Sequence, residues 1–133
     1  MKEVYDYLKK CGMFFVATID GDQPQVRPFS AVDLYEGRLY LQTGYPKKVS
    51  KQIAQNPHVA ICAFDGESHS WLRISATLVE DHRLEAKQHM IDNNEELQQR
   101  GYTAEGDYTE VLYMKDATAT FASHSSEPKV VTF

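Results

Sequence analysis

Basic residues gather where a strand-like segment gives way to a helix-like one. The segment RLYLQTGYPKKVSKQIAQNP, residues 38–57, places Lys47, Lys48 and Lys51 after a Gly-Tyr-Pro break. We expect Pro46 to occupy the first position of a helix, because a proline there lacks only an N–H group that the first turn leaves unpaired. Lys47 and Lys48 would then lie in that first turn.

This arrangement favours the binding of an anion. The N-terminus of a helix presents unpaired N–H groups and a partial positive charge. Two lysines in the first turn oppose the helix dipole by about 0.3–1 kcal/mol each, unless an anion such as a phosphate offsets them. The alternative is that the lysines form a solvated helix face, which is the commoner role of such clusters.

Arg27 and Thr43 could complete an anion site. Arg27 lies in the strand-like segment before residues 38–43, and hairpin pairing of the two would bring its guanidinium near the Thr43 hydroxyl and the lysines. Arg27 could equally form a surface salt bridge with Asp33 or Glu36. Sequence spacing leaves both alternatives open.

Composition and charge limit the classes of fold and partner. The chain has 133 residues, of which 42% are hydrophobic and 25% charged, so we expect one globular domain spanning residues 1–133. A net charge of -5 argues against nucleic-acid and anionic-membrane partners, since both need a broad basic surface. Residues 1–20 contain no long apolar run, because Lys9, Lys10 and Gly12 interrupt it. We therefore expect a cytoplasmic protein, and any anion that it binds should be small.

Two segments have helical spacing. From Lys2 to Cys11, apolar residues recur on one helix face, and Gly12 is placed to end the helix in a left-handed conformation. Residues 83–100 predict one polar helix with a sparse apolar stripe. Helices are therefore few, and most of the chain must form strands.

Alternating apolar residues between turn sequences predict six or seven strands. Asp20-Gly21 supplies a hairpin turn with Pro24 as a boundary, and Tyr35-Glu36-Gly37 and Asp65-Gly66 supply further turns. Close turns and few helices indicate a closed or nearly closed antiparallel barrel. The predicted strands are residues 14–19, 25–34, 38–43, 58–64, 70–81, 110–123 and 129–133.

The cysteines and histidines predict no metal site. Cys11 and Cys62 lie far apart and match no zinc-ligand spacing, so we expect free thiols in the core. His82 and His89 could share a helix face, but two imidazoles in a Glu- and Gln-rich helix are more often solvated than metal-bound.

These residues, taken in order, resemble a known family. The segment VRPFSAVDLYEGRLYLQTGYPKKVSKQIAQNPHVAICAF, followed by SWLRISATLVED, is similar to the pyridoxamine 5'-phosphate oxidase-like FMN-binding split barrels over residues 14–81. The short chain and the tail EVLYMKDATATF look most like the stand-alone members related to 5-nitroimidazole reductases. The resemblance implies a mainly β fold with flanking helices, built as a six-stranded antiparallel split barrel. It also implies a homodimer with one FMN in each of two clefts between the subunits.

The resemblance assigns the anion site to FMN. Arg27 would face the FMN phosphate or ribityl chain. Thr43 would hydrogen-bond near the flavin pyrimidine or the ribityl chain, and Lys47 and Lys48 would hold the phosphate.

The resemblance also implies contacts to the flavin ring. The backbone of Pro28, Phe29 and Ser30 would line the isoalloxazine. Trp71 falls where the family often supplies a contact from the second subunit, on the face of residues 70–81 that otherwise lacks a partner.

The implied function is that of an FMN-dependent oxidoreductase that reduces nitroaromatic or other small acceptors. A non-catalytic flavin-binding stress or redox-sensing protein is the alternative, and a barrel that binds haem or a deazaflavin is a third. Oxidation of pyridoxamine phosphate is not expected, because Val32 stands near the position of a lysine in the true oxidases, and the tail FASHSSEPKVVTF lacks their C-terminal Trp and Arg. His69 is the nearest counterpart of a histidine linked to nitroimidazole reduction, although we interpret it first as a turn residue. No catalytic side chain is predicted.

Overall fold

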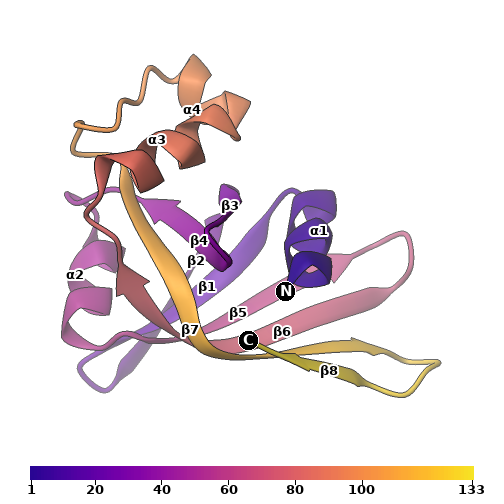
Figure 1. Ribbon diagram of the computed structural model, residues 1–133. Helices are drawn as coiled ribbons and strands as arrows, with labels where there is room; N and C mark the ends of the chain where they lie inside the picture. The colour runs from indigo at the N-terminus through magenta and orange to yellow at the C-terminus, as the bar shows by residue number, and fades with distance from the viewer.

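An eight-stranded antiparallel sheet with four flanking helices makes up the computed structural model, which describes residues 1–133 (Figure 1). The prediction of a mainly β fold is confirmed, whereas the count of six strands is wrong. The strands are β1 (Phe14–Asp20), β2 (Gln23–Phe29), β3 (Val32–Tyr35), β4 (Arg38–Thr43), β5 (His58–Asp65), β6 (Ser70–Glu80), β7 (Glu110–Ser123) and β8 (Lys129–Thr132). The helices are α1 (Lys2–Cys11), α2 (Lys48–Gln55), α3 (Leu84–Asp92) and α4 (Glu95–Gln99).

The order of the strands forces the sheet to curl. It runs β2-β1-β5-β6-β7-β4-β3, with β8 attached to β7, so β2 and β3 are opposite edges. Only Ser30 and Ala31 connect these two edges in the sequence. Three Cα–Cα steps of about 3.8 Å allow at most about 11 Å between Phe29 and Val32. The edges must therefore approach each other. Because β2 does not pair with β3, the closed form of the expected closed or nearly closed barrel is wrong, and an open seam remains.

The single strand predicted over residues 25–34 is therefore wrong. Its first half belongs to β2, which pairs with β1, and its second half belongs to β3, which pairs with β4. Pro24 lies inside β2 rather than at a boundary. A proline is tolerated there because β2 is an edge strand, whose outer N–H groups have no partner strand to bond.

The predicted turn between β3 and β4 is confirmed. Tyr35 pairs with Arg38, which leaves Glu36 and Gly37 as a two-residue loop. Their φ angles are 50° and 73°, the left-handed values that a tight hairpin turn of the primed type requires.

Strand β7 bends and changes partners along its length. Residues 110–113 pair with β4, and residues 118–121 pair with β8. Between these two stretches the register with β6 shifts, and Asp116 adopts a φ of 52°. A β-bulge of this kind re-aims a strand, so β7 can close one end of the curl and still extend the sheet at the other (Figure 1).

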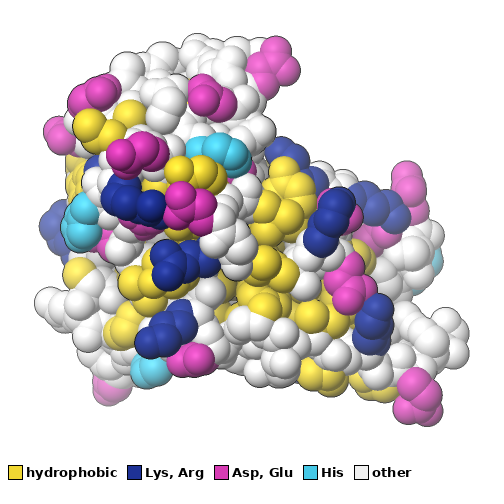
Figure 2. Space-filling view, viewed as in Figure 1, with side chains coloured by type: hydrophobic (Ala, Val, Ile, Leu, Met, Phe, Trp, Pro, Cys, Tyr) yellow, Lys and Arg dark blue, Asp and Glu magenta, His cyan; other side chains and the backbone are white.

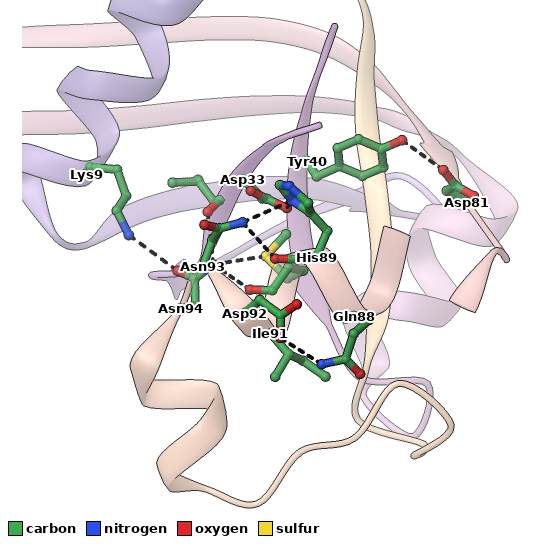
Figure 3. Close-up of polar contacts among 12 residues, drawn as sticks. Lys9, Asp33, Tyr40, Asp81, Gln88, His89, Ile91, Asp92, Asn93 and Asn94 are labelled. Carbon is green, nitrogen blue, oxygen red and sulfur yellow. Dashed lines mark hydrogen bonds and ion pairs between the residues drawn. The ribbon is translucent and has the colours of Figure 1, made fainter. Parts of the chain in front are cut away.

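The helices differ from prediction at one point. Helix α1 spans the predicted residues and ends at Gly12, whose φ is 75°. Residues 83–100 instead form two helices, which lie together at the top of Figure 1. The buried side chain of Asn94 donates to the backbone oxygens of Val32 and Met90 at 3.0 and 2.9 Å (Figure 3). In a continuing helix the Asn94 N–H would donate to the Met90 oxygen, but the side chain takes that acceptor and the Asn94 N–H donates to the Ile91 oxygen at 3.2 Å, so the helix breaks there.

Buried polar contacts fasten the α3–α4 segment to the sheet. His89 Nδ1 lies 2.6 Å from the Oδ2 atom of the buried Asp33, and Tyr40 donates to Asp81 at 2.8 Å (Figure 3). The His89 side chain is 37% exposed, so it keeps part of the solvation expected for it, while its ring contacts Asp33 and the ring of Tyr35, whose centroid is 4.4 Å away. The segment is therefore held as a fixed wall above β3 and β4.

The core fills the inside of the curled sheet. Val4 and Leu8 of α1 pack there, and Val49 and Ile53 of α2 pack against the same cluster. The apolar face of α2 thus fixes the helix, and its N-terminus follows directly from the end of β4. Because β4 and the core fix the start of α2, they also fix the positions of Lys47 and Lys48.

The surface carries mixed charges. On the face shown in Figure 2, Lys and Arg side chains alternate with Asp and Glu, and no broad basic stripe is visible. None of the helices has the length and apolarity needed to cross a membrane. Cys62 is exposed and Cys11 is half-buried, so the core position expected for Cys62 is wrong.

Candidate functional site

A pocket of about 230 Å³ opens at the seam. We call it the seam pocket. The end of β2 and the link to β3 form one wall, the end of β4 and the start of α2 form another, and Met13 and the end of α4 complete it. Its lining residues are Met13, Arg27, Pro28, Phe29, Ser30, Ala31, Gln42, Thr43, Lys47, Val49, Leu97 and Arg100.

A second hollow of about 360 Å³ lies next to the seam pocket. We call it the lysine hollow. It shares Arg27, Lys47 and Val49 with the seam pocket, so the two spaces adjoin. Its other lining residues are Asp20, Gln25, Lys48 and Gln52.

The structure brings seven of the eight predicted site residues to these two spaces. Arg27 and Lys47 line both spaces, Lys48 lines the lysine hollow, and Pro28, Phe29, Ser30 and Thr43 line the seam pocket. The role of each as a cofactor contact stays a prediction.

Trp71 lies outside both spaces. It pairs with Phe64 across β5 and β6, and its ring centroid lies 5.1 Å from that of His124. Its predicted contact comes from a second subunit, and this too stays a prediction. His69 lies in the turn between β5 and β6 with a φ of 52°, which fits its interpretation as a turn residue.

Arg27 is fixed by uncharged partners. Its Nη1 donates to Thr18 Oγ1 at 2.6 Å and to the backbone oxygen of Val16 at 3.2 Å, and its Nη2 donates to Gln52 Oε1 at 2.7 Å. Burial lowers the pKa of Arg27, and no carboxylate pairs with it. A half-buried cation without a counter-ion is the electrostatic setting in which an anionic ligand is favoured.

Two predictions about Arg27 are corrected by this geometry. The surface salt bridge is wrong, because Asp33 contacts His89 and Glu36 pairs with Arg83. The hairpin route to Thr43 is also wrong, because β2 pairs with β1 and β4 pairs with β3 and β7. Arg27 and Thr43 line the same pocket because the sheet curls.

Helix α2 begins one residue after Lys47, so Pro46 does not occupy its first position. The Lys47 N–H instead donates to the Gly44 oxygen at 3.0 Å, and this turn holds Pro46 outside the helix. The helix start has no side-chain cap and no acidic residue in its first turn. Its first N–H groups therefore remain available to an anion.

The turn that carries the lysines is braced from behind. The Tyr45 N–H donates to the Asp107 oxygen at 2.8 Å. A Cβ atom at Gly44 would lie 2.7 Å from the ring of Tyr108 and 3.2 Å from its Cα, so only glycine allows this approach. The φ angle of Gly44 is not positive, so its backbone conformation does not require glycine. The requirement comes from the close packing against Tyr108.

An acidic pair beneath the same turn was not predicted from the sequence. Tyr45 donates to Glu80 Oε2 at 2.5 Å, and His82 Nδ1 lies 3.1 Å from the same oxygen. The neighbouring Glu110 is 3% exposed, and its Oε1 atom has no hydrogen-bond partner. Burial raises the pKa of Glu110, and the Glu80 charge raises it further. The sequence offered one indication that Glu110 is buried. Alternate residues of a strand point to the same face, so Glu110 shares the face of the core residue Leu112 in β7.

The chain is similar over most of its length to a family model described as pyridoxamine 5'-phosphate oxidase, which matches residues 1–125. It is also similar to the crystal structure of a NimC/NimA family protein from Clostridium acetobutylicum. The sequence identity is 35%, the TM-score is 0.95, and the match covers 100% of this chain and 92% of that one.

More distant structures share the fold. The General Stress Protein 26 of Bacillus anthracis has 14% identity and a TM-score of 0.76, with 99% of this chain and 97% of that chain covered. A pyridoxamine 5'-phosphate oxidase-related, FMN-binding protein from Nostoc punctiforme has 13% identity and a TM-score of 0.64, with 99% and 93% covered. None of the curated proteins matches the chain.

The substitution Glu110→Gln should change how stability depends on pH. Because the folded protein holds the Glu110 proton more tightly than the unfolded chain does, the free energy of unfolding should fall as pH rises from 4.5 through the raised pKa. A glutamine does not titrate, so the variant should gain stability relative to the parent between about pH 4.5 and about pH 8. Thermal melts at both pH values measure this gain.

The matched control is Glu105→Gln, which alters an exposed carboxyl group that contacts neither Tyr45 nor Glu80. It should follow the parent at both pH values. Equal pH dependence of the parent and Glu110→Gln would contradict a proton held by the buried Glu110.

Proposed function

The chain belongs to the pyridoxamine 5'-phosphate oxidase family, and from this premise we propose that it binds FMN at the seam and acts as an FMN-dependent oxidoreductase. The family resemblance read from the sequence is thereby confirmed. The proposal places the FMN phosphate in the lysine hollow and the isoalloxazine ring in the seam pocket.

The charge of the lysine hollow is the observation that carries the proposal. Arg27, Lys47 and Lys48 line it beside a helix start without an acidic residue, in a chain whose net charge is -5. Asp20 is the only carboxylate among its lining residues. A phosphate group would offset the three cations and accept hydrogen bonds from the first turn of α2.

The seam pocket suits a flat heterocycle. Pro28, Phe29 and Ala31 offer backbone and apolar surface, and Gln42 and Thr43 end β4 on the other side. Gln42 Nε2 donates to the Thr43 oxygen at 3.0 Å and also to the oxygen of Tyr108, so its side chain is held in place. Bound FMN would carry electrons from a reduced donor to an acceptor, while the chain orients the ring and limits the access of water.

Pyridoxamine phosphate is not proposed as the substrate. Val32, which stands near the position of a lysine in the true oxidases, is fully buried in the core. The tail FASHSSEPKVVTF forms the end of β7 and strand β8, and it contains neither tryptophan nor arginine. Small nitroaromatic compounds are the acceptors that we propose, because the short chain and the tail EVLYMKDATATF resemble the stand-alone members related to 5-nitroimidazole reductases.

We also propose that the protein is a homodimer. Phe15, Val26 and Phe64 are 47%, 66% and 58% exposed on the outer face of strands β1, β2 and β5. Cys62 and the ring of Trp71 extend this face to β6, because Trp71 is directly opposite Phe64. An apolar sheet face of this kind is normally covered, and a second copy would bring Trp71 toward the partner's cleft.

FMN should bind much more tightly than riboflavin, because only FMN carries the phosphate. The double substitution Lys47→Glu and Lys48→Glu should weaken FMN binding by about 100-fold or more, since each charge-assisted contact contributes about 1.5 kcal/mol at least. Its control is Lys2→Glu with Lys115→Glu, which makes the same charge change at exposed positions away from both spaces. Titration followed by flavin fluorescence measures all three proteins. Equal binding of FMN and riboflavin would refute the phosphate site.

NADH should bleach the visible absorption of the FMN-loaded protein, and a nitroaromatic compound should restore it. This cycle distinguishes an oxidoreductase from a flavin carrier. Stable flavin absorption in the presence of NADH and other reduced donors would leave the stress-protein or redox-sensor alternative in place.

The double substitution Phe15→Asp with Val26→Asp should convert the dimer into a folded monomer, because it places charges on the proposed interface. Leu84→Asp is the control, since Leu84 is 50% exposed at the start of α3, outside this sheet face. Light scattering measures the mass of each protein. A parent that is monomeric and still binds FMN tightly would contradict the shared cleft.

A further inference from the structure

The seam pocket has a second cationic end. Leu97 and Arg100 come from the end of α4, and like Met13 and Ser30 they line the seam pocket but not the lysine hollow. Arg100 is exposed, and its side chain makes no hydrogen bond and no ion pair. A free guanidinium is therefore present on the wall away from Lys48.

The charges that line the seam pocket are all positive. Arg27, Lys47 and Arg100 are its only charged lining residues, although the whole chain has 19 acidic residues against 14 basic ones. Arg27 and Lys47 also line the lysine hollow, where a phosphate would offset them. Arg100 lines the seam pocket alone, so an FMN phosphate in the hollow leaves it without a counter-ion.

A helix-terminal arginine has an ordinary explanation, because a cation at the C-terminus of a helix offsets the helix dipole. Two observations go beyond it. Glu96 precedes Arg100 by four residues, a spacing suited to an ion pair, yet no such pair forms. The Glu96 carboxylate instead accepts a hydrogen bond from the Ser30 hydroxyl at 3.1 Å. The nearest acidic side chain along the helix is thus engaged elsewhere, and Arg100 remains free to bind a ligand.

We propose that Arg100 binds a carboxylate of the electron acceptor, so that the enzyme prefers small aromatic acceptors that carry a negative charge. The inference rests on the proposed function. Met13, which is 53% exposed, would contact the apolar body of the acceptor, and the planar guanidinium matches the two oxygens of a carboxylate. Arg100 is then a specificity-determining residue at the part of the seam pocket that the lysine hollow does not share.

The test measures binding to the FMN-loaded protein in the absence of any reductant. The probes are 4-nitrobenzoate and 4-nitrobenzamide, which differ in charge but little in size, and binding is followed by calorimetry. We expect the protein to prefer 4-nitrobenzoate roughly tenfold, the lower end for a charge-assisted contact at an exposed site. Arg100→Gln should abolish this preference, and the FMN content of the variant is measured first so that only FMN-loaded protein is compared.

Two further variants separate recognition from general charge and from folding. Arg100→Lys keeps the cation at the helix end but lacks the planar fork, so it should keep only part of the preference. Lys115→Gln removes one exposed positive charge far from the pocket and should retain the whole preference. If Arg100→Gln fails to fold, the Arg100→Lys variant still carries the test.

Each outcome decides the assignment. The role of Arg100 would be overturned if the parent protein bound the two probes equally or did not bind 4-nitrobenzoate. It would also be overturned if Arg100→Gln or Arg100→Lys kept the full preference. In each of these cases, FMN binding by the parent would leave the proposed function standing. A protein that does not bind FMN would overturn the proposed function, and the role of Arg100 with it.

Discussion

The two-residue link between β2 and β3 is the constraint on which the rest of the structure depends. Ser30 and Ala31 join strands that lie at opposite edges of the sheet order, so the sheet must curl until those edges approach. The curl encloses the core, and the unpaired edges leave the seam pocket between them. A flat sheet with the same pairings would have no pocket, because the end of β2 and the end of β4 would lie far apart.

The curl also explains how an acidic chain assembles a cationic site. Arg27 comes from β2, the lysines come from the turn after β4, and only the seam brings them together. Thr18 and Gln52 fix the guanidinium of Arg27 with uncharged groups, so its charge is positioned without being neutralised. The Arg27 side chain loses its conformational freedom when the protein folds and not when a ligand binds. This preorganisation favours a higher affinity for an anion.

Local signals in the sequence predicted the elements that depend on neighbouring residues. The end of α1 at Gly12 and the hairpin turn at Glu36-Gly37 are of this kind, because each follows from a backbone angle that few residues accept. The break between β2 and β3 was missed, because both halves of the segment have the pattern of a strand and only their separate hairpins, β2 with β1 and β3 with β4, divide them. The split between α3 and α4 was missed as well, since Asn94 finds one of its partners in β3. Among the seven site residues found in the two spaces, Arg27, Thr43, Lys47 and Lys48 were grouped by charge and spacing, and the family resemblance added Pro28, Phe29 and Ser30. The buried Glu110 carries no motif.

The two ends of the proposed site come from different parts of the chain. The cofactor end is built from β2, β4 and the start of α2, which the core holds in place. The acceptor end uses Leu97 and Arg100, which belong to the connection between β6 and β7. That connection is fastened by its own contacts, above all Asp33 with His89 and the buried amide of Asn94 (Figure 3). The connection also braces the cofactor end, through Ser30 with Glu96 and Tyr45 with Asp107. The side chain of Arg100 takes part in neither contact, so its substitution can alter which acceptor is preferred without removing a contact that holds the cofactor end.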